Sequence, residues 1–370
     1  MFINPFKFQD LNSILFYSGI ILSLMKHEHQ QLAQAIQHNC NISDARFAGN
    51  YTMCIYLLKM REYFRWEMAQ DFGSSLTRDD VGRWLTEREQ LWSDIEEQDY
   101  AHLDIEGELH DPFQSHPINS KLLEHGLIYS AGIGQKSKPH FFLADLEKHE
   151  TLNGYDIYIT AREYARDLTS PPAMSQEQTI YIRRESFKRM IWEKTEQWRW
   201  SKSNNAMARA IACYDFDSNL QHALDEMTEH ELESAILHEI GEIKAGQSLD
   251  GWQDMMSQLM FTQAEIMARA VRDHLADAIS TLPVLLEKQQ EASIHFYMAN
   301  LTSMRKHIFP TFVGAYNEWL ENRNIRKLEK LVDQSKYHWQ NIASEMLELF
   351  NQYGENSHEH IEQLVENNTL

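Results

Sequence analysis

The chain has 370 residues, of which 43% are hydrophobic and 24% charged, with only 14 Gly and 8 Pro. This length and composition allow one large or two moderate domains with proper cores, and they favour helix. The formal net charge of -21 repels phosphate backbones and anionic membranes, so we expect no nucleic-acid partner. The three cysteines, Cys40, Cys54 and Cys213, form no CxxC pair, which argues against a disulfide framework and suits the cytoplasm.

Residues 1–25 are predicted to be an N-terminal extension. Its apolar run ILFYSGIILSLM at 14–25 is too short to span a bilayer, which needs roughly 20 residues. No small-residue cleavage site follows this run, which argues against a signal peptide. Two interpretations are favoured: translation begins at Met25, or the run is a short packed helix. Secretion is the minor alternative.

Residues 26–125 are predicted to be a helical N-terminal region. Helical spacing of apolar residues indicates one helix at about 26–39 and a central, aromatic-rich one at 51–73. A more surface-like amphipathic pattern covers 78–107, and two prolines in 111–120 predict a loop.

Residues 126–176 are predicted to be a small β-region and a linker. Alternating β-branched and aromatic residues in 126–168 favour an antiparallel sheet, and TSPPAMSQ at 169–176 is typical of a linker. Helical periodicity then dominates 177–353, and the polar tail 354–370 is expected to fray. The fold class is therefore mainly α, with a multi-helix, bundle-like core and a small antiparallel sheet inserted near 126–168. The helices expected after the linker span 181–207, 217–246, 252–281, 284–306, 309–323 and 325–353.

The stretch LHEIGEIKAG at 237–246 carries the strongest chemical signal. It resembles the zinc HExxH motif at His238 and Glu239 but has Glu242 where the motif has its second His. On a helix, His238 and Glu242 lie about 40° apart and can converge on one cation. A carboxylate in place of an imidazole shifts the preference from Zn towards Fe or Mn. The resemblance makes His238 and Glu242 candidate metal ligands and Glu239 a candidate acid/base.

Small residues surround the two candidate ligands on the helix face. Gly241 and Ala245 lie on this side, and Gly in a helix interior costs about 1 kcal/mol relative to Ala. A close-packing reason is therefore expected, with another helix approaching this face. The competing interpretation is a solvated helix face that happens to carry His and Glu.

The next helix supplies further acids in MARAVRDHLADAISTLP at 267–283. Asp273 and Asp277 are spaced i, i+4 on an alanine-rich helix, and we predict that they complete the metal site. Acids on such a helix are costly to bury unpaired. An internal Arg–Asp network without metal, with Arg269 holding Asp273, is the alternative.

A di-metal carboxylate bundle is the second template. It uses Glu from two helices and Glu-x-x-His from two others, and Glu62 and Glu67 could supply the extra carboxylates. Against this, Glu62 could simply pair with Arg61 or Arg65.

Other polar groups are expected to be structural. Cys40, near Asp44 in HNCNISDAR, fits a core position better than a nucleophile. His295, Tyr297 and Arg305 fit core positions with satisfied polar tips. The chain has no P-loop, no GxGxxG after a strand and no GxSxG, so no nucleotide cofactor is expected.

Taken whole, the chain resembles an uncharacterised family of bacterial proteins of this length. The resemblance rests on four segments and covers most of residues 30–320, and it implies no particular reaction. The segments are QHNCNISDAR, YTMCIYLLKMREYFRWE, LHEIGEIKAG and ARAVRDHLADAISTLP.

Three functions follow as hypotheses. The first is a metal-dependent hydrolase that uses a divalent Zn, Fe or Mn ion to activate water. The second is a di-metal carboxylate oxidase. The third is a non-enzymatic interaction protein, in which the same groups form a buried ion-pair network and the acidic surface recruits a partner. The substrate, the partner and the oligomeric state do not follow from the sequence.

Overall fold

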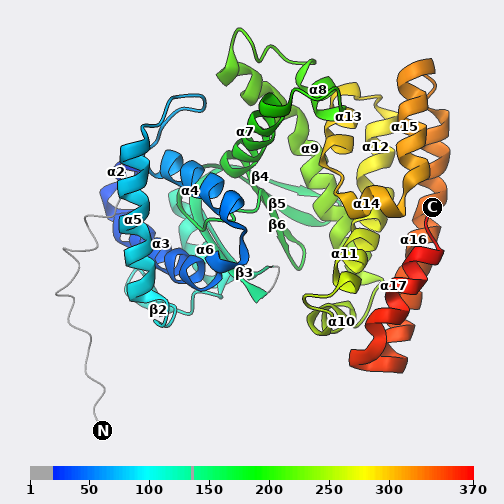
Figure 1. Ribbon diagram of the computed structural model, residues 1–370. Coiled ribbons are helices and arrows are strands. Elements are labelled where there is room, and N and C mark those ends of the chain that lie inside the picture. Colours follow the sequence, from blue (N-terminus) through cyan, green and yellow to red (C-terminus); the bar gives the residue numbers. More distant parts are fainter. Residues whose placement is uncertain (1–19, 135–136) are drawn as a thin grey trace. The chain divides into compact units, whose positions relative to one another are not determined.

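A computed structural model describes residues 20–134 and 137–370 (Figure 1). The fold is mainly helical with a small antiparallel sheet, which confirms the predicted class. Within these residues, no helix combines the length and the apolar character needed to cross a bilayer. The predicted N-terminal extension lies largely outside the described residues, which begin with the short helix α2 at Ile20–Ser23.

The chain divides into two compact units, each with its own hydrophobic core. Unit 1 comprises Met1–His149, Tyr158–Pro172 and Arg183–Arg189, and unit 2 comprises Glu150–Ile157, Ala173–Ile182 and Met190–Leu370. The helices of unit 1 after α2 are α3 (His27–Phe47), η2 (Ala48–Asn50), α4 (Met53–Glu67), α5 (Arg78–Ile95), α6 (Ser115–Leu122) and η3 (Leu123–His125).

The main sheet has five strands in the order β3-β4-β5-β7-β6. Antiparallel pairing of β3 with β4 runs from Leu127–Asp145 to Ile133–Pro139. Buried aromatic and β-branched side chains line these strands, as expected for a sheet covered by helices. The strands are β3 (Leu127–Ile133), β4 (Pro139–Leu152), β5 (Tyr155–Arg166), β6 (Ala173–Gln176) and β7 (Thr179–Arg183).

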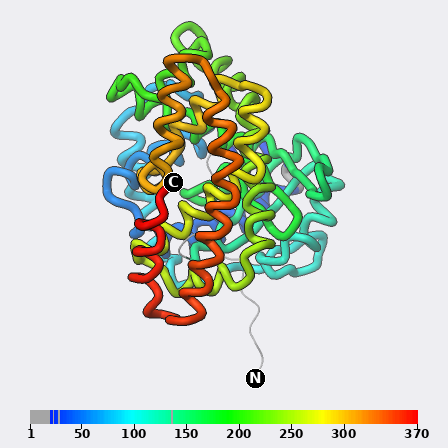
Figure 2. Tube along the Cα trace, turned by 90° about the vertical axis from the view of Figure 1, so that its right-hand side faces the viewer, coloured from blue at the N-terminus to red at the C-terminus, as the bar shows by residue number. Residues whose placement is uncertain are grey.

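Unit 2 is a helical assembly around the long helices α9 and α16. Figure 2 shows α15, α16 and α17 packed side by side, with Leu370 hydrogen-bonded back to Ile308. The helices of unit 2 follow the sheet in the sequence, and the first residues of α7 belong to unit 1. The helices are α7 (Arg184–Ser201), α8 (Ala206–Ile211), α9 (Leu220–Gln247), α10 (Trp252–Gln258), α11 (Gln263–Ala276), η5 (Asp277–Thr281), α12 (Leu282–Glu287), α13 (Glu291–Asn300), α14 (Ser303–Ile308), α15 (Pro310–Asn322), α16 (Arg326–Tyr353), η6 (Gly354–Ser357) and α17 (His358–Asn367).

Five short elements differ from the predictions for unit 1 and the sheet. The helix expected to reach residue 107 ends at Ile95, and a two-stranded sheet follows, β1 (Leu103–Ile105) and β2 (Glu108–His110). Its turn residues Glu106 and Gly107 both have positive φ, which is the geometry of a tight hairpin. In the expected loop at 111–120, α6 forms because its proline lies in the first turn, where proline is tolerated. The expected linker contains β6, and β7 occupies the start of an expected helix.

Two long predicted helices of unit 2 are interrupted. The helix expected at 252–281 is α10, α11 and the π-helical η5, whereas 284–306 is split among α12, α13 and α14. The C-terminal tail also differs, because it forms α17 instead of fraying. Ile361 and Val365, spaced i, i+4, are buried in the core of unit 2, and this burial stabilises the helix.

Gly241 lets α9 approach the end of α11 at very short range. A Cβ on Gly241 would lie 2.3 Å from the backbone oxygen of Ala276 and 2.8 Å from its carbonyl carbon. Both helices contact each other along this stretch, and α9 also packs against η5. The close-packing reason expected for this glycine is confirmed.

We predict that Gly241→Ala destabilises unit 2 by about 1–3 kcal/mol, because backbone atoms must move to admit the methyl group. Urea denaturation followed by circular dichroism measures this. Gly246→Ala is the matched control on the same helix, since the nearest atom to its Cβ lies 4.0 Å away. The control is expected to be neutral or stabilising by up to ~1 kcal/mol. Equal effects of the two substitutions would contradict the packing argument.

Candidate functional site

Helix α9 carries the predicted site and begins at a capping residue. The side chain of Asn219 accepts a hydrogen bond from the backbone N–H of His222 and so caps the first turn. Two turns before the C-terminal end of α9, His238 and Gly241 face the neighbouring elements. The side chain of His238 keeps 34% of its surface exposed, so it lies at the edge of the packed interior.

Asp277 is the centre of the polar cluster that His238 joins. It opens the π-helical segment η5 and is 1% exposed. Nδ1 of His238 lies 2.8 Å from its Oδ1, and the hydroxyl of Tyr297 donates to its Oδ2 at 3.0 Å. Arg305 of α14 also donates to Oδ2, and its Nη2 lies 2.9 Å from the Tyr297 hydroxyl. Both oxygens of Asp277 are therefore engaged by groups of the protein itself. We call His238, Asp277, Tyr297 and Arg305 the Asp277 network.

The charges of this network shift the pKa values of its members strongly. Burial alone would lower the pKa of His238, but Asp277 outweighs it and raises this pKa to about 10. Burial would raise the pKa of Asp277, yet Arg305 and His238 hold it well below its usual range. At neutral pH the pair is thus an imidazolium facing a carboxylate.

The other predicted acids have different partners. Glu242 forms an ion pair with Arg272 at 2.7 Å, and both side chains are about one-fifth exposed, at 20% and 23%. Glu239 is hydrogen-bonded to Ser175, and burial raises its pKa. Burial also raises the pKa of Asp273, which lies within electrostatic range of Glu242 and Arg305. The charges lie close together, but only His238 and Asp277 among the predicted ligands bond to each other.

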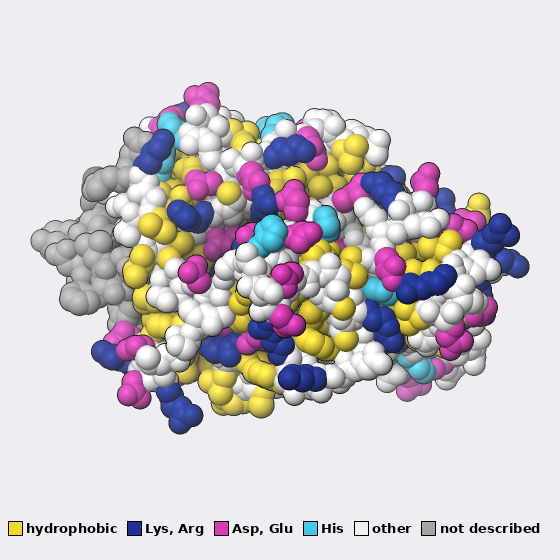
Figure 3. Space-filling model, turned by 90° about the horizontal axis from the view of Figure 1, so that it is seen from above, with side chains coloured by type: hydrophobic (Ala, Val, Ile, Leu, Met, Phe, Trp, Pro, Cys, Tyr) yellow, Lys and Arg dark blue, Asp and Glu magenta, His cyan; other side chains and the backbone are white. Residues whose placement is uncertain are grey.

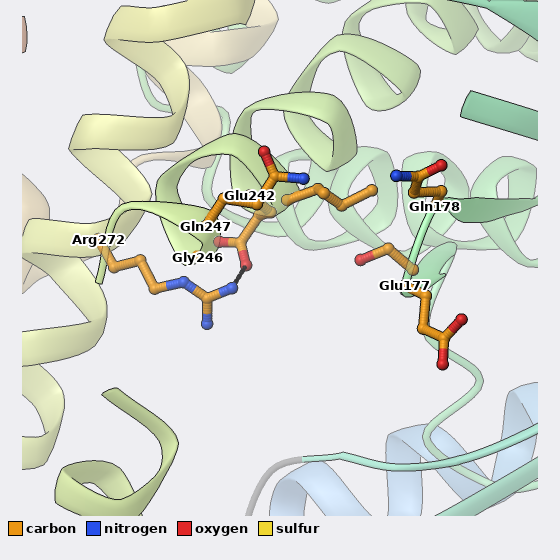
Figure 4. Close-up of a pocket in the computed structure, with 8 residues that line it drawn as sticks. Glu177, Gln178, Glu242, Gly246, Gln247 and Arg272 are labelled. Atoms are coloured by element: carbon orange, nitrogen blue, oxygen red, sulfur yellow. Dashed lines mark ion pairs between the residues drawn. The ribbon is translucent and has the colours of Figure 1, made fainter. Parts of the chain in front are cut away.

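A pocket of about 440 Å³ lies beside this part of α9, in unit 2. Figure 4 shows the Glu242–Arg272 pair on one side of the pocket and Glu177 with Gln178, from the β6–β7 turn, on the other. Its volume falls in the range of small-molecule sites, about 300–1,000 Å³. The wall is polar, with two carboxylates and one guanidinium, so it suits a polar ligand that carries a positive charge. The remaining lining residues are Ser175, Ile243, Gly246 and Gln247.

The predicted ligands do not converge in the way a metal site requires. A divalent cation bound to Asp277 would have to displace Arg305 or share the carboxylate with it, and Glu242 would have to leave Arg272. Among the described residues, no group of three or more His, Cys, Asp or Glu side chains is placed to hold a metal ion. Metal ligation by His238, Glu242, Asp273 and Asp277 stays a prediction.

Arg305 and Tyr297 are the members that the sequence analysis placed in the core without a role at the site. They lie 28 and 20 residues after Asp277 in the chain, so no local spacing connects them to it. Arg269, which was expected to hold Asp273, pairs instead with Glu265 one turn earlier, at 2.8 Å. That expectation is wrong, because the i, i+4 partner on the same face is Glu265. The general alternative of an internal Arg–Asp network is nevertheless what Asp277 forms.

His274, also near Asp277 in sequence, is a core residue. Its ring stacks on Trp339 at 5.1 Å, and its Nε2 lies 2.9 Å from the Arg305 carbonyl oxygen. Burial, reinforced by the charge of Arg305, lowers its pKa to about 3. His274 is therefore neutral at physiological pH, and its Nε2–H donates to that carbonyl.

The carboxylates proposed for a second metal are engaged within unit 1. Glu62 pairs with Arg61 and Arg65, at 2.9 and 3.1 Å, as the simpler interpretation expected. Glu67 accepts from Arg88 and from the indole N–H of Trp84. These contacts give both buried acids the partners that burial demands.

Unit 1 also contains a charged cluster that the sequence analysis did not assemble. Lys138 donates to Asp44 at 2.7 Å, and Nδ1 of His140 lies 3.1 Å from Oδ2 of Asp167. Burial raises the pKa of Asp44 to about 6 despite the nearby Lys138. Cys40, on the same helix as Asp44, is fully buried, and burial raises the pKa of its thiol. The prediction that Cys40 is a core residue is confirmed, since a reactive cysteine needs an exposed, acidified thiol.

Comparison with protein families finds two adjoining matches. Residues 31–183 match the N-terminal domain, and residues 188–368 the C-terminal domain, of a "Family of unknown function (DUF6866)". The chain belongs to this family. Comparison with curated proteins and with solved structures found no match. The predicted membership of an uncharacterised family is thus confirmed, and the Asp277 network lies wholly within the DUF6866 C-terminal domain.

We predict that the pairing of His238 with Asp277 makes the stability of this DUF6866 protein depend on pH. Because the folded pKa of His238, about 10, lies above its ordinary value of 6.5, the pair stabilises fully below pH 6.5. This stabilisation is lost as the pH rises towards 10. His238→Gln should therefore lower the free energy of unfolding most below pH 6.5 and progressively less above it. Urea denaturation at several pH values measures the free energy of unfolding. The control is His307→Gln, which changes an exposed histidine.

Glu231 gives a second loss of stability with rising pH, in a lower pH range. It is 1% exposed, accepts from the Ser293 hydroxyl at 2.7 Å, and burial raises its pKa from 4.5 to about 7. Stability is therefore expected to fall by up to about 3 kcal/mol as the pH rises from 4.5 to above 7. Glu231→Gln should remove this loss and be the more stable protein at pH 8, with little difference at pH 4.5. The half-exposed Glu233 of the same helix provides the control, Glu233→Gln.

Proposed function

We propose that the protein is a non-enzymatic interaction protein in which two of the predicted metal ligands, His238 and Asp277, belong to a structural ion-pair network. The observation that supports this is the engagement of both Asp277 oxygens by His238, Tyr297 and Arg305. A buried carboxylate held in this way is neutralised within the protein, and both of its oxygens already accept hydrogen bonds from the protein. The network fixes α9 against η5, α13 and α14, and α9 in turn forms one wall of the polar pocket.

A metal-dependent hydrolase remains the second candidate, because one observation favours it. Nδ1 of His238 bonds to buried Asp277, and metal-binding histidines are commonly oriented by a carboxylate in this way while the other ring nitrogen binds the ion. His238 would then be a ligand, and Glu239, beside the pocket residue Ser175, the acid/base. For the di-metal oxidase, the arginine partners of Glu62 and Glu67 give no comparable support.

Metal content and the stability of an Asp277 variant together distinguish these candidates. We expect the chain, purified without a chelating tag, to contain well under one Zn, Fe or Mn per molecule by elemental mass spectrometry. Asp277→Asn should lower the free energy of unfolding by about 3–5 kcal/mol, because it leaves buried Arg305 unpaired. Glu242→Gln breaks the pair with Arg272, which keeps partial contact with solvent, and should cost less than Asp277→Asn, about 1 kcal/mol.

A stoichiometric metal would overturn the proposal if it disappears in His238→Ala while the fold is retained. A cost for Asp277→Asn no larger than that for Glu242→Gln would also contradict it. Either result would favour the metal-dependent enzyme.

A further inference from the structure

The first half of α4 exposes hydrophobic side chains over about half of its circumference. Met53 is 70% exposed, and Ile55 and Leu57 are 47% exposed. At about 100° per residue, these positions and Leu58 span an arc of about 200° around the helix axis. From Met60 onwards, α4 is buried in the core of unit 1, so one helix is half core and half exposed apolar surface.

Two further apolar side chains belong to this surface. Ile20 of α2 and the following Leu24 are 51% and 45% exposed, and α2 packs against α4. We call the set of Ile20, Leu24, Met53, Ile55, Leu57 and Leu58 the apolar ridge. Each Leu, Ile or Met side chain that stays exposed lacks the roughly 1.5–3 kcal/mol of stabilisation that full burial would give. Contiguous exposed apolar residues of this kind mark interaction sites.

Helix α5 lies beside the ridge and is acidic on its exposed side. The hydroxyl of Tyr56, within the ridge segment of α4, donates to Glu89 of α5 at 2.9 Å. This contact places Glu89 of the acidic surface next to the apolar side chains of α4. The exposed acids outnumber the exposed bases Arg78 and Arg83. They are Asp79, Asp80, Glu87, Glu89 and Asp94 on α5 and Glu96 and Glu97 directly after it.

We propose that the apolar ridge and the acidic surface of α5 together bind a basic amphipathic helix of a partner protein. This inference rests on the proposed function as an interaction protein and names the class of partner. The apolar face of such a helix would cover the ridge, while its Lys and Arg side chains would face α5. The same acids disfavour a second copy of this chain, whose net charge is -21, and an anionic membrane, because both would bring like charges together.

A labelled model peptide tests the proposal on the full chain. The probe is a fluorescein-labelled peptide of leucine and lysine with leucines at helical spacing, and its control has the same composition with that spacing destroyed. Fluorescence anisotropy should show binding of the amphipathic peptide at low salt and weaker binding as salt rises. Ile55→Gln combined with Leu58→Gln should weaken binding about tenfold or more, since the apolar contact is lost while helix propensity is kept.

Matched variants locate the binding. Ile266→Gln removes an equally exposed side chain of unit 2 (54% exposed) and should leave the affinity unchanged. Glu87→Gln combined with Asp94→Asn should weaken binding and reduce its salt dependence. Cys54, exposed within the ridge segment, gives a direct readout in a Cys213→Ser background. The peptide should slow the reaction of Cys54 with a thiol reagent.

Several results would overturn the proposal. They are equal binding of the control peptide, unchanged affinity in the Ile55/Leu58 double variant, or unprotected Cys54. A dimer detected by light scattering that dissociates in the double variant would identify a second copy as the occupant instead. These readouts concern unit 1, whereas metal content and the Asp277→Asn stability concern unit 2, so failure of one proposal is distinguishable from failure of the other.

Discussion

The short contact between Gly241 and the Ala276 carbonyl is the constraint on which the candidate site depends. No side chain other than hydrogen fits at residue 241 while the two helices keep this separation. The approach brings α9 next to the residue after Ala276, which is Asp277, and so places the carboxylate within reach of His238. The π-helical turn at Asp277–Thr281 follows at once. Such single π-helical turns inside α-helices are frequent at functional sites.

The buried charges of both units obey the same energetic rule. Removing a charge from water costs more than a surface ion pair returns, so each buried charge needs an opposite charge and additional hydrogen bonds. Unit 1 satisfies the rule with Arg183 against Glu163 and Lys138 against Asp44, and unit 2 with Arg305 against Asp277. Such networks specify one arrangement of the core because few alternative packings satisfy all partners. This is a structural role that requires titratable groups in the interior without requiring a reaction.

The sequence predicts local features of the fold, such as a close approach between helices, but it does not predict contacts between residues far apart in the chain. The small residues beside His238 predicted a close helix approach because glycine within a helix has a specific cost that packing must offset. His238 and Asp277 were predicted to lie together as ligands of one metal on consecutive helices, but their direct contact was not predicted. Arg305 was not assigned to the site because tertiary contacts bring it there, and the spacing of residues along the sequence does not indicate such contacts. The strand β7 and the hairpin β1–β2 were missed because runs of three to five residues cannot establish a period.

Leu370 is part of the hydrogen-bonded framework of unit 2. The backbone N–H of Leu370 donates to the carbonyl of Ile308, and the N–H of Thr311 donates to the carbonyl of Leu370. These bonds close a loop of about sixty residues, whose ordering entropy must be overcome before the contacts form. During synthesis, α14 and α15 therefore emerge from the ribosome without their final partner. The contacts that join α14 and α15 to residue 370 therefore form only after residue 370 has been made, so this part of unit 2 closes late in folding.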